Sequence, residues 1–164
     1  MKAITEATLG FAKDDADGED SRNVDLTALV GSIADDLLAT GVDAHLETDA
    51  RVVALCRPAA LGRALRNLIE NAAIYGRRAN INIGDDGGAI RIVIEDNGPG
   101  IAEADMERVF EPFVRLEGSR HRATGGIGLG MAISRNIVRR HGGDVSLANR
   151  TEGGLRVTVT LPKS

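Results

Sequence analysis

The sequence is poor in aromatic residues, has one cysteine and contains no long apolar segment. Its 164 residues include three Phe, one Tyr and no Trp. Cys56 cannot form an internal disulfide, and because it ends an apolar run we expect a buried small hydrophobic side chain there. No stretch is as long and apolar as a membrane span, and Met1 is not followed by a signal-peptide core. These absences favour a soluble, cytoplasmic domain.

An excess of positive charge is absent as well. The formal net charge is -4 at pH 7 and Lys and Arg form no block, which argues against a surface for nucleic acid or for an anionic membrane. The length fits one domain that can bury its own core. Residues 14–20 are acidic and contain glycine, which is typical of a solvated linker. We therefore expect a residual helix and acidic linker over residues 1–23 and one folded domain over residues 24–164.

Apolar residues recur at helical spacing in three parts of this domain. A first helix is expected over residues 26–38 after Asp25 as a cap, and a second over about 59–75, with Pro58 suited to its first turn. A third is expected to open at Gly128 and to end at His141-Gly142-Gly143, where glycine can adopt the left-handed closing conformation. Residues expected on the buried faces of the second and third helices are Leu61, Leu65, Leu68, Ala72, Leu129, Ile133 and Ile137.

Period-two alternation predicts strands between these helices. A hairpin is expected around the turn Asp85–Gly88, and in the last strand Leu155, Val157, Val159 and Leu161 share one face. A sheet that is apolar on one side must be covered there by helices. We predict an α+β, two-layer α/β sandwich with a mixed, mostly antiparallel sheet covered on one face. The expected strands are 44–48, 52–55, 81–83, 90–95, 144–148 and 155–161.

The stretch Asp96-Asn97-Gly98-Pro99-Gly100 follows one of these strands and carries a carboxylate in a glycine turn. One buried carboxylate at this place can accept the exocyclic amine of adenine, and it would refuse guanine, which has a carbonyl there. Gly98 and Gly100 let the backbone pass close to a base, and Pro99 stiffens the bend. An ordinary turn after a strand is the alternative, because Asp-Asn-Gly is common in turns.

Asn67 and Asn71 lie four residues apart in the second helix, so their carboxamides project from nearly the same face. Mg²⁺ bound to ATP needs hard oxygen ligands and few protein groups beside the phosphates. Asn71 can supply an oxygen without adding negative charge, and Asn67 can assist directly or through water. For this pair alone, two helix-surface asparagines without a function remain the favoured interpretation.

A second glycine-rich run, Gly125 to Gly130, precedes the third helix. Backbone amides can approach phosphates there, where the positive end of the helix dipole faces the anion. No Gly-Lys-Ser/Thr follows, so the run is not a P-loop, and Met131 stands where the last glycine of the dinucleotide-binding fingerprint should be. A glycine-rich linker is the remaining alternative.

In this order and spacing, the motifs resemble the ATP-binding catalytic domain of bacterial sensor histidine kinases, in the superfamily shared with gyrase, Hsp90 and MutL. The Phe-Glu-Pro-Phe-Val-Arg segment is similar to the class of the osmosensor EnvZ. The resemblance spans about Val24 to Pro162 and implies a Bergerat fold, with residues 24–164 as an ATP-binding kinase catalytic domain. Asn67–Tyr75 matches the N box, Asp96–Ile101 the first glycine box, Val109–Arg115 the phenylalanine box and Gly125–Met131 the second glycine box.

The resemblance implies ATP and Mg²⁺ as cofactors and assigns roles to individual residues. Asn71 would hold the metal with Asn67 assisting, Asp96 would bind the adenine amine, and Tyr75 would lie against the base. Phe110 and Phe113 would anchor the hinge of a lid or belong to the core. Further nucleotide contacts would come from Gly98, Gly100, Ile101 and Leu129, from Gly126, Gly128 and Gly130 beside the phosphates, and from Arg115 and Arg122 in the lid.

The sequence departs from the family in two places. Ile74 stands where Lys or Arg is usual, and our hypothesis is that Arg77 or Arg78 supplies the missing phosphate contact. The acceptor histidine is also absent, since no histidine has the required context on a dimerisation helix. The implied partners are a separate dimerisation domain that carries this histidine and a response regulator downstream, with no nucleic acid and no direct membrane contact. The three histidines are interpreted as a strand residue (His45), a lid residue (His121) and a helix cap (His141).

Asn67 also bears on the reaction, because hydrolytic relatives place a glutamate there to activate water. An asparagine cannot accept a proton at neutral pH, which favours transfer to a protein over hydrolysis. Glu70 could orient an incoming imidazole, or it could be a solvated helix charge. Three functions remain open: a histidine kinase catalytic domain, a superfamily ATPase or serine kinase, and a nucleotide-binding module without transfer. The domain would be cytoplasmic, on its own or as part of a membrane-bound sensor.

Overall fold

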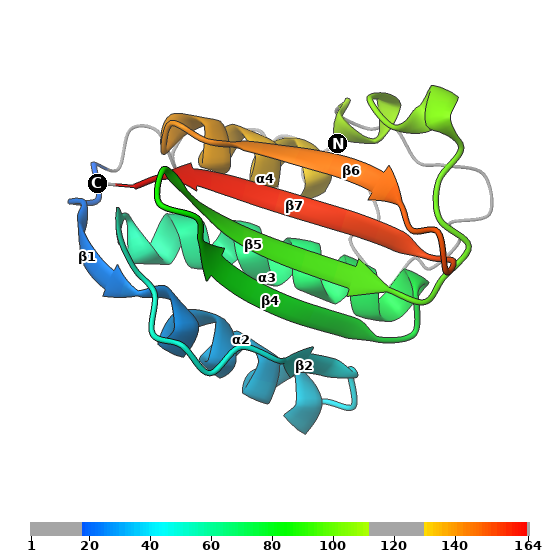
Figure 1. Cartoon of the computed structure of the whole chain (residues 1–164), viewed down its shortest axis with the longest axis horizontal. Helices are drawn as coiled ribbons and strands as arrows, with labels where there is room; N and C mark the ends of the chain where they lie inside the picture. The colour runs from blue at the N-terminus through cyan, green and yellow to red at the C-terminus, as the bar shows by residue number, and fades with distance from the viewer. Residues whose placement is uncertain (1–17, 112–129, 164) are drawn as a thin grey trace, which may run out of the picture.

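The computed structural model describes residues 18–111 and 130–163, and its centre is a five-stranded sheet (Figure 1). The expected helix over residues 1–13 and most of the expected loop 108–124 lie outside the described residues. The strand order is β2-β4-β5-β7-β6; β2 and β4 are parallel, whereas the other neighbours are antiparallel. The strands are β2 (Ala44–Leu46), β4 (Ala79–Asp85), β5 (Ala89–Asp96), β6 (Asp144–Asn149) and β7 (Leu155–Pro162).

In Figure 1, α3 (Pro58–Tyr75) and α4 (Gly130–Arg140) lie behind this sheet and α2 (Leu26–Ala39) lies beside β2 at its edge, so the predicted two-layer α+β sandwich is confirmed. Two 3-10 turns, η1 (Glu103–Asp105) and η2 (Arg108–Phe110), follow β5. The expected loop is wrong at its start, because Val109 and Phe110 of η2 are buried in the core. In the described ranges no helix combines the length and the apolar character that a membrane crossing requires.

A smaller two-stranded sheet was only half predicted. The expected strand 52–55 is present as β3 (Val53–Cys56), but it pairs antiparallel with β1 (Arg22–Asp25) and not with the main sheet. Strand β1 crosses the expected domain boundary after residue 23. Cys56 is buried as expected, and burial raises the pKa of its thiol.

The core lies between the sheet and the helices. Alternate residues of β5 and β7 point into it, and Ile92, Ile94 and Val159 have no exposed surface. Opposite them lies the expected stripe of α3, on which Leu61, Leu65, Leu68 and Ala72 are all buried. Ile133 of α4 is only partly buried, because Ala132, Ile137 and Val138 form the inner side of that helix. The asparagines lie on an adjoining, half-buried side of α3, from which Asn67 reaches Ser134 of α4.

The capping residues expected from the sequence are found at the observed helix ends. Asp25 caps α2 by accepting a hydrogen bond from the amide of Ala28 at 2.9 Å, and Pro58 opens α3. Gly142 closes α4 with a φ of 86°. His141 caps that end through Nδ1 and the carbonyl of Ile137 at 2.8 Å, while its Nε2 accepts the amide of Arg57 at 3.1 Å. The end of α4 is thereby tied to the start of α3.

The start of α3 has a cap that the sequence does not reveal. Arg57 makes no side-chain capping bond, and the amides of Ala59 and Ala60 instead donate to the Glu19 carboxylate at 2.8 and 3.1 Å. Carboxylates stabilise helix N-termini through such bonds and through the helix dipole. Glu19 was assigned to a solvated linker; in the structure it is attached to the helix that carries Asn67 and Asn71.

Replacing Glu19 by Gln is expected to lower the free energy of unfolding by about 1 kcal/mol, because two amides lose a charged acceptor at a helix end. Urea denaturation measures the change. Asp20→Asn removes the same charge at an exposed neighbour and should leave stability within about 0.5 kcal/mol of the parent. Equal effects of the two substitutions would contradict the capping role.

Candidate nucleotide-binding site

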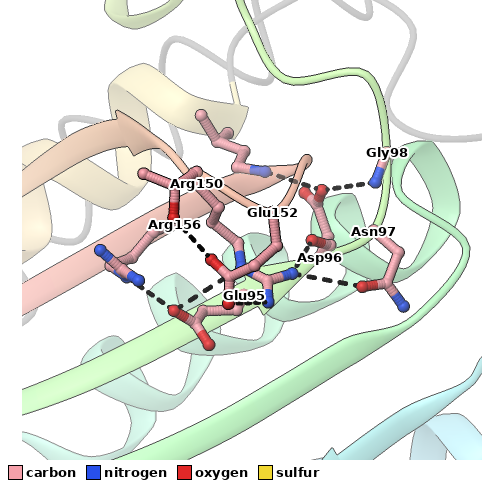
Figure 2. Close-up of polar contacts among 9 residues, drawn as sticks. Glu95, Asp96, Asn97, Gly98, Arg150, Glu152 and Arg156 are labelled. Atoms are coloured by element: carbon pink, nitrogen blue, oxygen red, sulfur yellow. Dashed lines mark hydrogen bonds and ion pairs between the residues drawn. The ribbon is translucent and has the colours of Figure 1, made fainter.

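Asp96, the last residue of β5, is a buried carboxylate held by two backbone amides. Its side chain belongs to a residue only 5% exposed, and Oδ1 accepts hydrogen bonds from the amides of Gly98 at 2.9 Å and Leu155 at 3.0 Å (Figure 2). One amide comes from its own turn and the other from the start of β7. Two donors from separate segments fix the orientation of the carboxylate, as the adenine hypothesis requires.

The backbone packs around Asp96 so closely that glycine is needed on two sides. A Cβ on Gly76, just after α3, would lie 2.3 Å from the Asp96 Cβ, and a Cβ on Gly154 would lie 2.0 Å from the Asp96 carbonyl oxygen. The amide of Asn97 also donates to the carbonyl of Gly76 at 3.1 Å. The end of the asparagine helix and the first glycine motif are therefore in direct contact.

The glycine turn is held at its far end by Asn149 of β6. The Asn149 carboxamide accepts from the amide of Ile101 at 2.9 Å and donates to the carbonyl of the same residue at 2.7 Å. Gly100 precedes this pair with a φ of 76°, and a Cβ on it would lie 2.3 Å from the Asn149 Oδ1. The turn needs glycine here for its conformation and for the close approach.

Asn67 joins α3 to the start of α4. Its Nδ2 donates to the Ser134 hydroxyl at 3.1 Å, and that hydroxyl donates to the carbonyl of Ala64 at 3.2 Å. Ser134 is fully buried. A Cβ on Gly130, the first residue of α4, would lie 2.7 Å from both polar atoms of the Asn67 carboxamide. The N box and the described end of the second glycine motif therefore meet.

The other helix residues of the predicted site lie along the half-buried edge of α3. Glu70, Asn71, Ile74 and Tyr75 are all partly exposed there. Beyond the helix, Arg77 is exposed with a φ of 71°, and Arg78 donates through Nε to Asn80 at 3.0 Å.

A cationic side chain of α4 holds the turn that follows the glycine motif. The Arg135 guanidinium lies 4.2 Å from the centroid of the Phe110 ring and pairs with Glu107 at 3.0 Å and with Asp144 at 3.2 Å. A hydrogen bond from Arg139, helped by the Val145 amide and by Arg135, lowers the pKa of Asp144 to about 2. Phe110 therefore lies in the core, beneath a charge cluster that stays ionised at neutral pH.

The described residues of the predicted site form two groups of contacts. Asp96, Gly98 and the end of α3 are in contact, and Asn67 meets Gly130. Arg115, Arg122, Gly126, Gly128, Leu129 and the second phenylalanine, Phe113, lie outside the described residues.

Sequence reasoning missed Ser134, Arg135, Asn149 and Arg150, all of which touch the site or its supporting turns. Each acts across a long sequence separation, and none stands in a local pattern that marks it. Only their proximity after folding shows their connection with the site.

The fold and the site define a class: an α/β sandwich in which a helix with two carboxamides meets a buried carboxylate at a strand end. The family described as histidine kinase-, DNA gyrase B- and HSP90-like ATPase matches residues 56–164, and the chain belongs to this family. It is a histidine kinase-type ATP-binding domain.

Three relatives illustrate the similarity. Sensor histidine kinase GtrS of Pseudomonas aeruginosa is 39% identical over 99% of this chain and 33% of its own length. The ATP binding domain of PrrB from Mycobacterium tuberculosis has a TM-score of 0.73 and 29% identity, over 89% of this chain and 99% of that one. Full-length ShkA in complex with AMPPNP has a TM-score of 0.70 and 25% identity, over 87% of this chain and 31% of that one. The chain thus spans about a third of the length of GtrS, and of ShkA.

Proposed function

We propose that this chain is the catalytic domain of a sensor histidine kinase, which transfers the γ-phosphoryl group of ATP to a histidine on a separate dimerisation domain. A response regulator would then receive the phosphoryl group. Family membership and the relation to GtrS support the proposal. The domain would act in the cytoplasm, alone or as part of a membrane-bound sensor. Residues 24–164 would form most of it, and Glu19 and β1 of the expected linker pack against it.

The observation that carries the proposal is the buried, oriented carboxylate of Asp96. Because Oδ1 already accepts two backbone amides, Oδ2 is the atom that can accept the exocyclic amine of adenine. Tyr75, at the end of α3, would lie against the base, while Gly98, Gly100 and Ile101 border it. A charged acceptor makes a stronger hydrogen bond than a neutral one, so the site would prefer adenine over purines with a carbonyl at that position.

The residues of α3 fit a Mg²⁺ ion bound to ATP. No cluster of three or more His, Cys, Asp or Glu occurs in residues 18–111 and 130–163, so a closed metal cage of protein side chains is not built there. A metal that keeps waters and phosphate oxygens needs only one or two protein oxygens. Asn71 would supply one, and Asn67, whose amide nitrogen is fixed on Ser134, would assist. When bound, the ion would neutralise charge on the phosphate oxygens.

The other residues of the site would contribute by positioning the reacting groups. Asn67 stands where a hydrolytic relative would have a base, and its carboxamide cannot take a proton from water. Glu70, beside Asn71, would orient the incoming imidazole. The lid cations Arg115 and Arg122, together with Gly126, Gly128, Leu129 and Gly130, would surround the phosphates.

Two measurements test the function. Mg-ATP and Mg-ADP should raise the melting temperature more than Mg-GTP does, because a ligand that binds only the native state stabilises it. Addition of the detached dimerisation domain with labelled ATP should produce phosphohistidine. Free phosphate alone would indicate a superfamily ATPase, and ATP binding with neither product would indicate a binding module; either result overturns the kinase proposal.

Asn71→Ala is expected to remove most of the effect of Mg²⁺ on ATP affinity, a loss of about tenfold in Mg-ATP binding. Titrating Mg²⁺ against a fixed ATP concentration measures this. Asn71→Asp keeps an oxygen ligand and should retain the dependence, whereas Asn23→Ala, at an exposed position of β1, should change nothing. An unchanged Mg²⁺ dependence in Asn71→Ala would show that other groups hold the metal.

A further inference from the structure

The turn between β6 and β7 lies directly against the glycine turn that carries Asp96 (Figure 2). It is a tight turn in which the amide of Arg150 donates to the carbonyl of Gly154 at 2.9 Å, and the amide of Gly153 donates back to the carbonyl of Arg150 at 3.1 Å. Gly154 passes so close to Asp96 that a side chain would not fit. These residues are more than fifty positions from Asp96 in the sequence, and no motif marks them.

Arg150 makes the polar contacts of this turn with the adenine-binding candidate. Its Nη1 donates to the carbonyl of Asp96 at 2.7 Å and to the side-chain oxygen of Asn97 at 3.2 Å. The same side chain is 15% exposed and lies between two carboxylates, Glu95 at 3.8 Å and Glu152 at 3.6 Å. One guanidinium group therefore holds both the main chain of Asp96 and the residue that follows it.

Burial of the Arg150 guanidinium is energetically unfavourable in itself. Its Nε is buried and makes no hydrogen bond among the described residues, although it lies 3.8 Å from the Glu95 carboxylate. A buried donor without a partner is unfavourable, and so is a charge withdrawn from water. A surface ion pair with Glu95 would not require such burial, as Arg156 demonstrates: it pairs with the same carboxylate at 2.6 Å while 42% exposed. What distinguishes the buried Arg150 from Arg156 is its pair of hydrogen bonds to Asp96 and Asn97.

Asn149, the neighbour of Arg150, holds the other end of the same turn through both backbone groups of Ile101. The adjacent side chains of Asn149 and Arg150 therefore bond to the backbone of Ile101 and Asp96. The amide of Leu155 donates to the Asp96 carboxylate itself. The glycine turn has few side chains with which to fix its own shape. The β6–β7 hairpin therefore supplies contacts at both ends of the turn, in addition to the bonds of Gly98 to Asp96 and of Asn97 to Gly76.

We propose that Arg150 is a positioning residue for base recognition: it holds Asp96 and Asn97 so that the Asp96 carboxylate faces the amine of a purine. The inference rests on the proposed adenine site. A hydrogen bond of the carboxylate with the amine depends steeply on direction, whereas base stacking and phosphate contacts depend little on this residue. Loss of Arg150 therefore weakens binding of a nucleotide that has the amine and barely changes binding of one that lacks it.

The test compares ATP with ITP, whose base has a carbonyl in place of the amine, on the whole chain. Arg150→Met keeps the apolar stem and removes the donors; the expected result is about a tenfold loss of ATP affinity with ITP affinity changed less than about twofold. Arg150→Lys keeps one charged donor and should restore part of the ATP preference. Melting temperatures without nucleotide report the purely structural effect.

Arg156→Met is the matched control, because it removes the same charge and a partner of the same Glu95 but touches neither Asp96 nor Asn97 in the described contacts. It should keep the ATP preference. The proposal is overturned if Arg150→Met keeps that preference, or if ATP and ITP weaken equally, which indicates a structural role alone. Should Arg150→Met fail to fold, Arg150→Gln, which removes the charge and shortens the side chain, decides: selectivity equal to the parent overturns the proposal and reduced selectivity supports it. If the parent chain itself shows no preference for ATP over ITP, the proposed adenine site is wrong. This outcome is distinct from a failure of the Arg150 inference alone.

Discussion

Asp96→Asn is expected to lower ATP affinity about 100-fold, the largest effect of any single polar substitution in the site. The amides of Gly98 and Leu155 can still donate to the carboxamide oxygen, so the turn keeps its shape. The carboxamide nitrogen then faces the amine of adenine, which places two donors opposite each other. Isothermal titration with ATP and ITP measures the change, and ITP, whose carbonyl can accept from that nitrogen, should bind the variant better than the parent.

Asp86→Asn provides a control of similar chemistry. Asp86 lies at the opposite end of the β4–β5 hairpin, where its Oδ1 accepts the amides of Gly88 and Ala89. Its substitution perturbs an acidic turn residue without approaching the site, so ATP affinity should stay the same. If Asp96→Asn kept the parent's preference for ATP over ITP, the carboxylate would not be the group that senses the base.

Gly154→Ala is expected to destabilise the protein by about 3 kcal/mol or more and to abolish nucleotide binding. The added Cβ would lie 2.0 Å from the Asp96 carbonyl oxygen, which is backbone and cannot rotate away, and Gly154 has a φ of 95°. Relief requires β7 and the glycine turn to move apart, which breaks the bonds of the Leu155 amide and of Arg150 to Asp96. Urea denaturation and ATP titration measure the two effects.

The adjacent Gly153→Ala separates strain from collision. Gly153 has a φ of 102°, and a Cβ there meets nothing within 4 Å, so the substitution carries only the conformational strain, about 1 kcal/mol. ATP binding should survive in this variant. Equal destabilisation by the two alanines would indicate that the contact of Gly154 with Asp96 is unimportant.

The local parts of the fold were accessible from the sequence because they depend on near neighbours. The stripe Leu61-Leu65-Leu68-Ala72 required a helix, and the Ile90-Ile92-Ile94 alternation required a strand with one buried face. Asp25, Pro58 and Gly142 marked helix ends for reasons of capping and backbone freedom. By contrast, β1 and its pairing with β3 were missed, since Arg22–Asp25 has neither an apolar run nor a clear alternation.

In the candidate site, too, some residues were predictable from the sequence and others were not. Asp96, Asn67 and Asn71 stood out because oxygen-bearing side chains occurred at a strand end and at helical spacing. The contacts of Glu19 with α3, of Arg135 with Phe110 and of Arg150 with Asp96 could not be predicted, because each joins residues far apart in the chain. Such contacts depend on the order of strands in the sheet and on the packing of helices, which no local pattern encodes.

By itself, the sequence determined the α/β architecture, the helix that presents Asn67 and Asn71, and the order of motifs characteristic of the family. Only the tertiary structure decided how the carboxylate of Asp96 is held. β5 and β7 are neighbours in the sheet, so the hairpin that begins β7 reaches the end of β5 and supplies the Leu155 amide and the Arg150 guanidinium. The turn contributes the Gly98 amide itself, but a turn rich in glycine has few side chains of its own, and the other contacts that hold it come from residues distant in the sequence.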